Sequence, residues 1–347
     1  ALIRSIFPRA TVDEVLLSMQ FGADPVVGQN PKGQVGTLGS GRLNVKKALD
    51  MAATLVKDKT PLSGSASSPF RKNKGAKPAV FSAKFGETPR VWTIMPDLLE
   101  EKSWLAYSEK FKGGVNAAVG QFDSDPEFEV VTGPGEGGGP HIRIFSLSGE
   151  LEGEFYAFET TDRGGVSVAA ADTDSDGIDE IIAVSGKTRA ASVRIFGTDG
   201  TVKIEFQPER DTPGVFAVAA GDVFGDSRDE IVLAGPGDSS RVFVYNWEGR
   251  PRASFEAFPN QKGKVSITVI DEGGMKWIAV RGPKGSVRLF TLTGVYIGEW
   301  EIKGQDSIQA FDHNEDGVPS VAARLAGAIT VLSTKIGVLE AYHQLIN

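Results

Sequence analysis

The sequence has no cysteine and only three histidines among its 347 residues. The absence of cysteine excludes a disulfide scaffold, a zinc–thiolate site, an iron–sulfur cluster and a cysteine nucleophile. The histidines, at positions 141, 313 and 343, lie too far apart for a short-spaced zinc motif, and none has a glycine-flanked serine nearby. Because no Ser–His–Asp triad is evident, we expect this chain to be inactive as an enzyme on its own.

A basic block and a long apolar run are also missing. Lysine and arginine number 37 against 45 aspartate and glutamate, a net charge of -8, which argues against nucleic acid as a partner. No run of about 18 apolar residues exists, so we expect no membrane span. The chain starts Ala-Leu-Ile-Arg, without methionine or leader, which suggests that residue 1 is not the native start.

The first 78 residues differ in composition and in predicted secondary structure from the rest. Residues 1–56 suggest helices: Thr11 and Glu14 form a capping box, a glycine-rich turn follows at 33–41, and a second helix is expected from Leu43. Residues 57–78 are rich in Ser, Gly, Pro and Lys, which predicts a flexible linker.

From residue 79 to 347 the sequence is repetitive. Residues 113–158, 164–206 and 214–258 each hold four short alternating apolar segments with similar turns. Weaker units lie at 277–300 and 309–342, and residues 90–107 match the last half of a unit. A period of about 45–50 residues with four strands predicts a β-propeller, here of about six blades. A β-sandwich is the alternative, but it does not need the same turns at a fixed period.

The most informative loop is Asp172-Thr-Asp-Ser-Asp-Gly-Ile-Asp-Glu. Three alternating carboxylates converge when such a loop curls, and oxygen ligands alone suit Ca²⁺. An EF-hand would need an acid at the twelfth position, which is Ala183, so a strand–loop–strand site is predicted. The expected ligands are Asp172, Asp174, Asp176, the carbonyl of Ile178, and Glu180.

Three further loops carry parts of this pattern. The loop at 312–320 keeps Asp312, Asn314 and Asp316 but has Ser320 in place of the closing acid, which makes it a second, weaker calcium candidate. The other two loops are interpreted as acidic turns that close hairpins. One holds Gln121, Asp123, Asp125 and Glu129, and the other holds Asp222, Phe224, Asp226 and Glu230.

These repeats resemble the FG-GAP family, also called VCBS repeats, over about residues 90–345. The resemblance rests on the Asp-x-Asp-x-Asp-Gly-x-x-Glu loop, the apolar strand after it, and the Gly-Pro-Gly that follows at Gly133 and Gly235. It implies structural calcium at the Asp172 loop and a protein or glycan as the ligand of the propeller.

The front segment resembles the end of a subtilisin-like serine protease domain. The match is carried by Pro8-Arg-Ala-Thr-Val-Asp-Glu-Val-Leu and by Gly39-Ser-Gly-Arg-Leu-Asn-Val-Lys-Lys-Ala-Leu. It implies that residues 1–56 are the last helices of a truncated catalytic domain in a secreted prokaryotic protease. The propeller would then be its targeting module. The alternatives are an adhesin or glycan-binding propeller without a protease, and a propeller enzyme such as a polysaccharide lyase.

Overall fold

The computed structural model describes most of the chain from residue 77 onward. The described ranges are 23–24, 42–43, 77–95, 101–186, 191–208, 215–224, 226–272, 275–301, 307–311, 320–325, 328–333 and 341–345. They contain strands and turns but no helix, and so no helix there could cross a membrane.

The N-terminal part contributes two short strands. β1 (Ala23–Asp24) pairs antiparallel with β2 (Arg42–Leu43). Leu43, the expected first residue of the second helix, therefore lies in a strand, because its pairing with Ala23 prevails over local helical periodicity. The rest of the predicted helices and the linker lie outside the described residues, and the division into 1–56, 57–78 and 79–347 stays a prediction.

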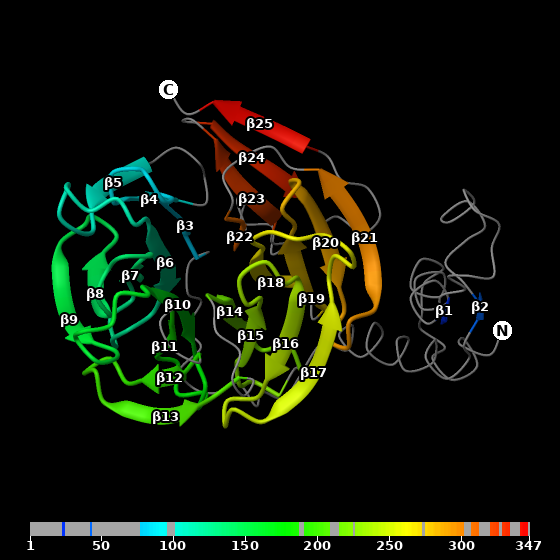
Figure 1. Cartoon of the computed structure of the whole chain (residues 1–347), viewed down its shortest axis with the longest axis horizontal. Coiled ribbons are helices and arrows are strands. Elements are labelled where there is room, and N and C mark those ends of the chain that lie inside the picture. Colours follow the sequence, from blue (N-terminus) through cyan, green and yellow to red (C-terminus); the bar gives the residue numbers. More distant parts are fainter. Residues whose placement is uncertain are drawn as a thin grey trace. The chain divides into compact units, whose positions relative to one another are not determined.

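The remaining strands form six sheets, in each of which every strand lies beside its sequence neighbour (Figure 1). The first sheet has three strands: β3 (Ala79–Ser82), β4 (Arg90–Ile94) and β5 (Glu101–Leu105). Blade 1 has β6 (Val115–Gly120), β7 (Glu129–Pro134), β8 (His141–Ser146) and β9 (Leu151–Tyr156). Blade 2 has β10 (Val166–Ala171), β11 (Glu180–Ser185), β12 (Val193–Phe196) and β13 (Val202–Phe206).

The last three blades continue this order. Blade 3 has β14 (Ala217–Gly221), β15 (Glu230–Ala234), β16 (Arg241–Tyr245) and β17 (Pro251–Glu256). Blade 4 has β18 (Ser266–Glu272), β19 (Met275–Arg281), β20 (Ser286–Phe290) and β21 (Tyr296–Glu301). Blade 5 has β22 (Gln309–Phe311), β23 (Ser320–Leu325), β24 (Ala328–Ser333) and β25 (Ala341–Leu345).

The structure corrects the predicted number of blades from six to five complete ones. The three-stranded sheet corresponds to the second to fourth strands of a repeat, since β3 lies against β6 as β7 lies against β10 and as β15 lies against β18. Among the described residues this sheet has no innermost strand. It nevertheless completes the ring, because β3 contacts β6 on one side and β22 on the other.

Blades 1, 2 and 3 are buried along their middle and exposed at their outer edge. Every residue of β7, β11 and β15 is buried, whereas β9 and β17 alternate between exposed and half-buried residues. A continuous apolar strand indicates burial on both faces, and an alternating one indicates an edge. Neighbouring blades therefore cover both faces of the inner strands.

A glycine in the turn between the third and fourth strands allows the blades to approach closely. Gly249 has φ of 76°, and a Cβ there would lie 2.5 Å from the ring of Phe206 in the preceding blade. A side chain would thus both strain the turn and collide with that ring. The same contact recurs at Gly149 with Trp104, Gly200 with Phe155, and Gly294 with Phe255.

An arginine on the third strand also ties each of several blades to its predecessor. Arg194 donates from Nη1 to the carbonyl of Ala157 over 2.8 Å, lies over the ring of Phe158, and pairs with Glu205 of its own blade. Arg143 and Arg288 repeat this arrangement with the carbonyls of Ala106 and Ala257. The arginine satisfies a main-chain acceptor that ends the outer strand of the neighbouring blade.

In blade 3 this arginine is replaced by another residue. The corresponding position is Phe243, and the carbonyl that the arginine would bind belongs to Pro208. The hydroxyl of Tyr245, two residues further along β16, donates to the Pro208 carbonyl instead. The same acceptor is therefore satisfied by a different residue from the same strand.

The last blade closes against the first sheet. Ala322 of β23 packs with Phe81 and Ile94, and the buried Arg324 pairs with Glu101 over 3.0 Å. Its guanidinium also lies 4.2 Å from the ring centre of Trp92. These contacts join residues more than 220 positions apart in the chain.

Replacing Arg324 by methionine should open this junction. The change keeps the apolar stem but removes an ion pair and a cation–π contact, so we expect the free energy of unfolding to fall by about 2–3 kcal/mol. Urea unfolding at neutral pH measures the effect. Arg250→Met is the control, because Arg250 pairs with Glu248 at an exposed position and should change stability by no more than about 0.5 kcal/mol. Equal stability of the two variants would contradict this account of ring closure.

Candidate metal centre

Three described loops join the first and second strands of blades 1, 2 and 3, at residues 121–129, 172–180 and 222–230. In each loop the glutamate at the ninth position is buried and accepts the backbone N–H of the second position. The bonds are Phe122 N to Glu129 Oε2 at 2.7 Å, Thr173 N to Glu180 Oε2 at 2.9 Å, and Val223 N to Glu230 Oε2 at 3.0 Å. The glutamate thus closes the hairpin from inside.

The aspartate at the eighth position connects the loop to the preceding blade. Asp229 Oδ2 accepts the N–H of Asp172 over 3.0 Å, and the Asp229 N–H donates to the Asp172 carbonyl over 3.0 Å. Asp179 makes the same two bonds with Gln121, at 2.9 and 2.6 Å. This role is not evident from the sequence, where both aspartates look like further members of an acidic motif.

The Asp172 loop brings together three of the predicted ligands. Carboxylate oxygens of Asp172, Asp174 and Asp176 lie within 4.8 Å of one another. The turn depends on Ser175, whose φ is 66°, and on Asp176, whose Oδ1 accepts the N–H of Ile178 over 2.8 Å. Three carboxylates at such distances repel one another unless a cation or a proton lies between them.

The Asp172 side chain is incompletely satisfied. Its Oδ2 accepts the N–H of Gly177 over 3.1 Å, but its buried Oδ1 has no hydrogen-bond partner in the part of the chain that the structure describes. Burial raises the pKa of Asp172 above its usual range, more than the bonds from Gly177 and Ser175 lower it. The loop therefore contains a buried carboxylate oxygen without a hydrogen-bond partner among the described residues.

Glu180, the fourth predicted carboxylate, is directed elsewhere. Its Oε2 accepts bonds from Thr173, and its Oε1 lies 2.6 Å from the ammonium of Lys203, which is also 3.3 Å from Asp174 Oδ2. Lys203 lies on β13 in the same blade. These contacts raise the pKa of Lys203, chiefly through its bond to Glu180, so it stays charged. A bound cation would compete with this ammonium for Asp174.

The neighbouring loops have a different set of hydrogen bonds at the same central position. In blade 1 the first residue is Gln121, whose Nε2 donates to the carbonyls of Asp123 and Asp125. In blade 3 it is Asp222, whose Oδ1 and Oδ2 accept the N–H groups of Asp226 and Ser227 over 3.0 Å each. Asp172 is the only one of these three first residues with a buried carboxylate oxygen that lacks a hydrogen-bond partner among the described residues. The buried Oε1 of Gln121 lacks one too, but it is a neutral amide oxygen.

The other predicted loops have different outcomes. Asp123, Asp125 and Glu129 also bring oxygens within 4.8 Å of one another, although the sequence favoured a simple turn there. Asp123 Oδ1 does accept the N–H of Asp125 over 2.7 Å, as expected for such a turn. The second calcium candidate, with Asp312, Asn314 and Asp316, lies outside the described residues.

The ring of four-stranded meanders defines the class of this chain as a β-propeller. No protein-family model and no curated protein matches the sequence. Among solved structures, a complex of BBS1N with ARL6DN, soaked with lead, is similar at 13% identity, with 76% of this chain and 81% of that chain covered and a TM-score of 0.48. The mercury-soaked form of that complex is similar at 14% identity over 78% and 81%, with a TM-score of 0.46.

A protein of unknown function from Bacteroides caccae is similar at 15% identity, with 60% of this chain and 70% of that chain covered and a TM-score of 0.43. Identities this low carry no function over to this chain. The propeller assignment rests on the strand order and ring contacts of the chain itself.

Glu230, the glutamate that closes the loop of blade 3, should make stability depend on pH. Burial raises the pKa of Glu230 from 4.5 to about 7, so the folded state binds this proton more tightly than the unfolded state. Its stabilising effect is then complete below pH 4.5 and is lost as the pH rises to about 7. We expect Glu230→Gln, which keeps an acceptor for Val223, to weaken the fall in stability across this range. Urea unfolding between pH 4.5 and 8 in chelator measures it, and an unchanged profile would count against the buried, protonated Glu230.

Proposed function

We propose that this chain is a non-catalytic binding module, a β-propeller whose Asp172 loop takes up Ca²⁺. The observation that carries the metal is the buried Asp172 Oδ1, which lacks a partner beside the carboxylates of Asp174 and Asp176. Ca²⁺ suits an oxygen-only ligand set with irregular geometry, whereas Zn²⁺ would seek nitrogen or sulfur. The ion would lie between the three aspartates, and Glu180 would continue to close the hairpin.

The proposed module works outside the cell or at its surface. Flexible loops of this kind bind Ca²⁺ with dissociation constants of about 10⁻⁴–10⁻³ M in extracellular modules. Such affinities are useful where calcium is abundant. The resemblance of the repeats to FG-GAP propellers supports a protein or glycan as the ligand.

The link to a subtilisin-like protease rests on the resemblance of residues 8–16 and 39–49. In this proposal the propeller positions the protease against a surface or a substrate. The competing proposal is an adhesin or glycan-binding propeller without a protease. The encoding DNA upstream of Ala1 separates the two: a Gly-Thr-Ser nucleophile motif supports the protease, and its absence supports the adhesin.

Calcium should raise the melting temperature chiefly through the Asp172 loop. At about 10 mM Ca²⁺, roughly 10 to 100 times the expected dissociation constant, binding adds about 1.4–2.7 kcal/mol. For a domain of this size we expect the melting temperature to rise by roughly 3–10 °C relative to chelator. Asp172→Asn should abolish the rise, and the matched control Asp222→Asn should retain it, because both Asp222 oxygens already accept N–H bonds.

Lys203 provides a second measure of the same site. Lys203→Met removes the ammonium that competes for Asp174, so calcium should bind a few-fold to about tenfold more tightly. Titration calorimetry gives the dissociation constant directly. Weaker calcium binding in this variant, or equal melting temperatures of the wild type with calcium and with chelator, would refute the calcium proposal.

A further inference from the structure

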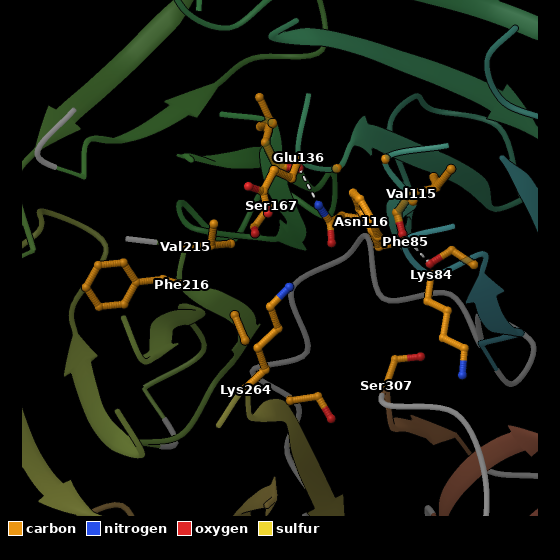
Figure 2. A pocket seen from close by; sticks show the side chains of 18 of the residues that line it. Lys84, Phe85, Val115, Asn116, Glu136, Ser167, Val215, Phe216, Lys264 and Ser307 are labelled. Atoms are coloured by element: carbon orange, nitrogen blue, oxygen red, sulfur yellow. Dashed lines mark hydrogen bonds between the residues drawn. The ribbon is translucent and has the colours of Figure 1, made fainter. Parts of the chain in front are cut away.

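A cavity of about 580 Å³ lies at one end of the propeller axis (Figure 2). All six sheets contribute to its wall, mostly where the first strands of the blades begin and where β3 ends. This volume is in the range of small-molecule sites, and the end of a ring axis is a concave position. The cavity is separate from the Asp172 loop, none of whose residues line it.

One cation is directed into this cavity. Figure 2 shows the Lys264 side chain extending from one side, with its ammonium directed towards Asn116 and Ser167. Lys264 has no ion pair or side-chain hydrogen bond with any other residue that the structure describes. Lys84, which also lines the cavity, points away from Asn116 and Ser167. Lys264 is an exposed residue, like Lys84, and it brings one positive charge towards Asn116 and Ser167.

Neutral polar groups lie around the same space. Asn116 donates from Nδ2 to the Val166 carbonyl over 2.7 Å, which leaves its Oδ1 facing the cavity (Figure 2). Ser167 is only 6% exposed and lines the wall. The Ser266 hydroxyl is buried and has no hydrogen-bond partner among the described residues, although it borders the cavity. A buried hydroxyl without a partner costs about 1–3 kcal/mol, which a ligand can recover.

The rest of the wall is largely apolar. Val115, Val166, Val215 and Val265 contribute to it from four different blades. The two acids in the lining, Glu136 and Asp238, are exposed residues of the turns that follow β7 and β15. The centre therefore combines one ammonium, two hydroxyls and an amide oxygen with aliphatic surface.

We propose that this axial cavity binds a small hydroxylated carboxylate of the size of a sugar acid. Its carboxylate would accept bonds from Lys264 Nζ, and its hydroxyl groups would bond with Asn116 Oδ1, Ser167 and Ser266. The C–H face of the ligand would lie on the valines. This inference rests on the proposed binding function and names a ligand class for it, at a site distinct from the calcium loop.

Binding of glucuronate tests the proposal, with glucose as the neutral match. Titration calorimetry or saturation-transfer NMR on the whole chain should detect glucuronate binding at least about tenfold tighter than glucose, as expected for a charge-assisted bond. Lys264→Met should remove this preference, whereas Lys84→Met should keep it, since that lysine points away. Both variants should show wild-type circular dichroism and the wild-type melting shift with calcium.

Each outcome decides the question. Equal binding of glucuronate and glucose, no binding of either up to about 10 mM, or an undiminished preference in Lys264→Met would overturn the proposal. A lost preference in Lys264→Met with an intact calcium response would support it. The calcium response is measured separately, so failure of the axial site and failure of the calcium proposal can be told apart.

Discussion

The hydrogen bonds that pass between consecutive blades are the constraint on which the rest of this structure depends. A four-stranded sheet of short strands has two faces to bury and cannot do so alone, so each blade needs a neighbour on both sides. Asp179 and Asp229 fix where these neighbours meet by holding the first residue of the preceding loop with two bonds each. The loop conformation and the packing of the ring are therefore set by the same residues.

The hydrogen bonds at the outer edge of the ring show which partner in the contact between blades is constant. Three blades satisfy the end of the preceding outer strand with an arginine, and blade 3 does so with the hydroxyl of Tyr245. The donor changes, but the main-chain acceptor stays in place. The fold requires that the carbonyl at the blade junction accepts a hydrogen bond. An unpaired buried acceptor lowers the stability by more than the exchange of one donor for another changes it.

Much of the fold can be predicted from the sequence because each repeat carries its own strand and turn signals. The partial repeat at 90–107 is recognisable in the sequence as the last half of a unit. The additional strand β3 at 79–82 is not, because its place in the ring depends on partners far away in the chain. Local periodicity suggested a helix at Leu43, and a pairing with Ala23 across the intervening chain decided otherwise. A local sequence pattern does not contain information on contacts between distant segments, so these two features could not be predicted from it.

The same difference between local and long-range information applies to the candidate metal site. The convergence of Asp172, Asp174 and Asp176 follows from their spacing within one loop. The position of Lys203 does not, because strand pairing brings this residue of β13 to Glu180 of β11 from 23 positions away. The acidic loop motif ends at its ninth position, Glu180, so Lys203 lies outside it.

The three loops share the glutamate that closes the hairpin but differ in the residue at their centre. Glutamate at the ninth position closes every described loop, whatever residue stands first. The first residue then determines which groups the centre of the loop holds. Gln121 donates from its amide nitrogen and leaves a neutral amide oxygen unpaired, Asp222 accepts backbone N–H groups with both oxygens, and Asp172 leaves a carboxylate oxygen unpaired. A propeller built this way folds around all of its loops, and the loop with the unpaired carboxylate oxygen is the one for which we propose a cation. The net charge of -8 therefore predicts little about metal content, because most of the loop acids are already occupied by the main chain.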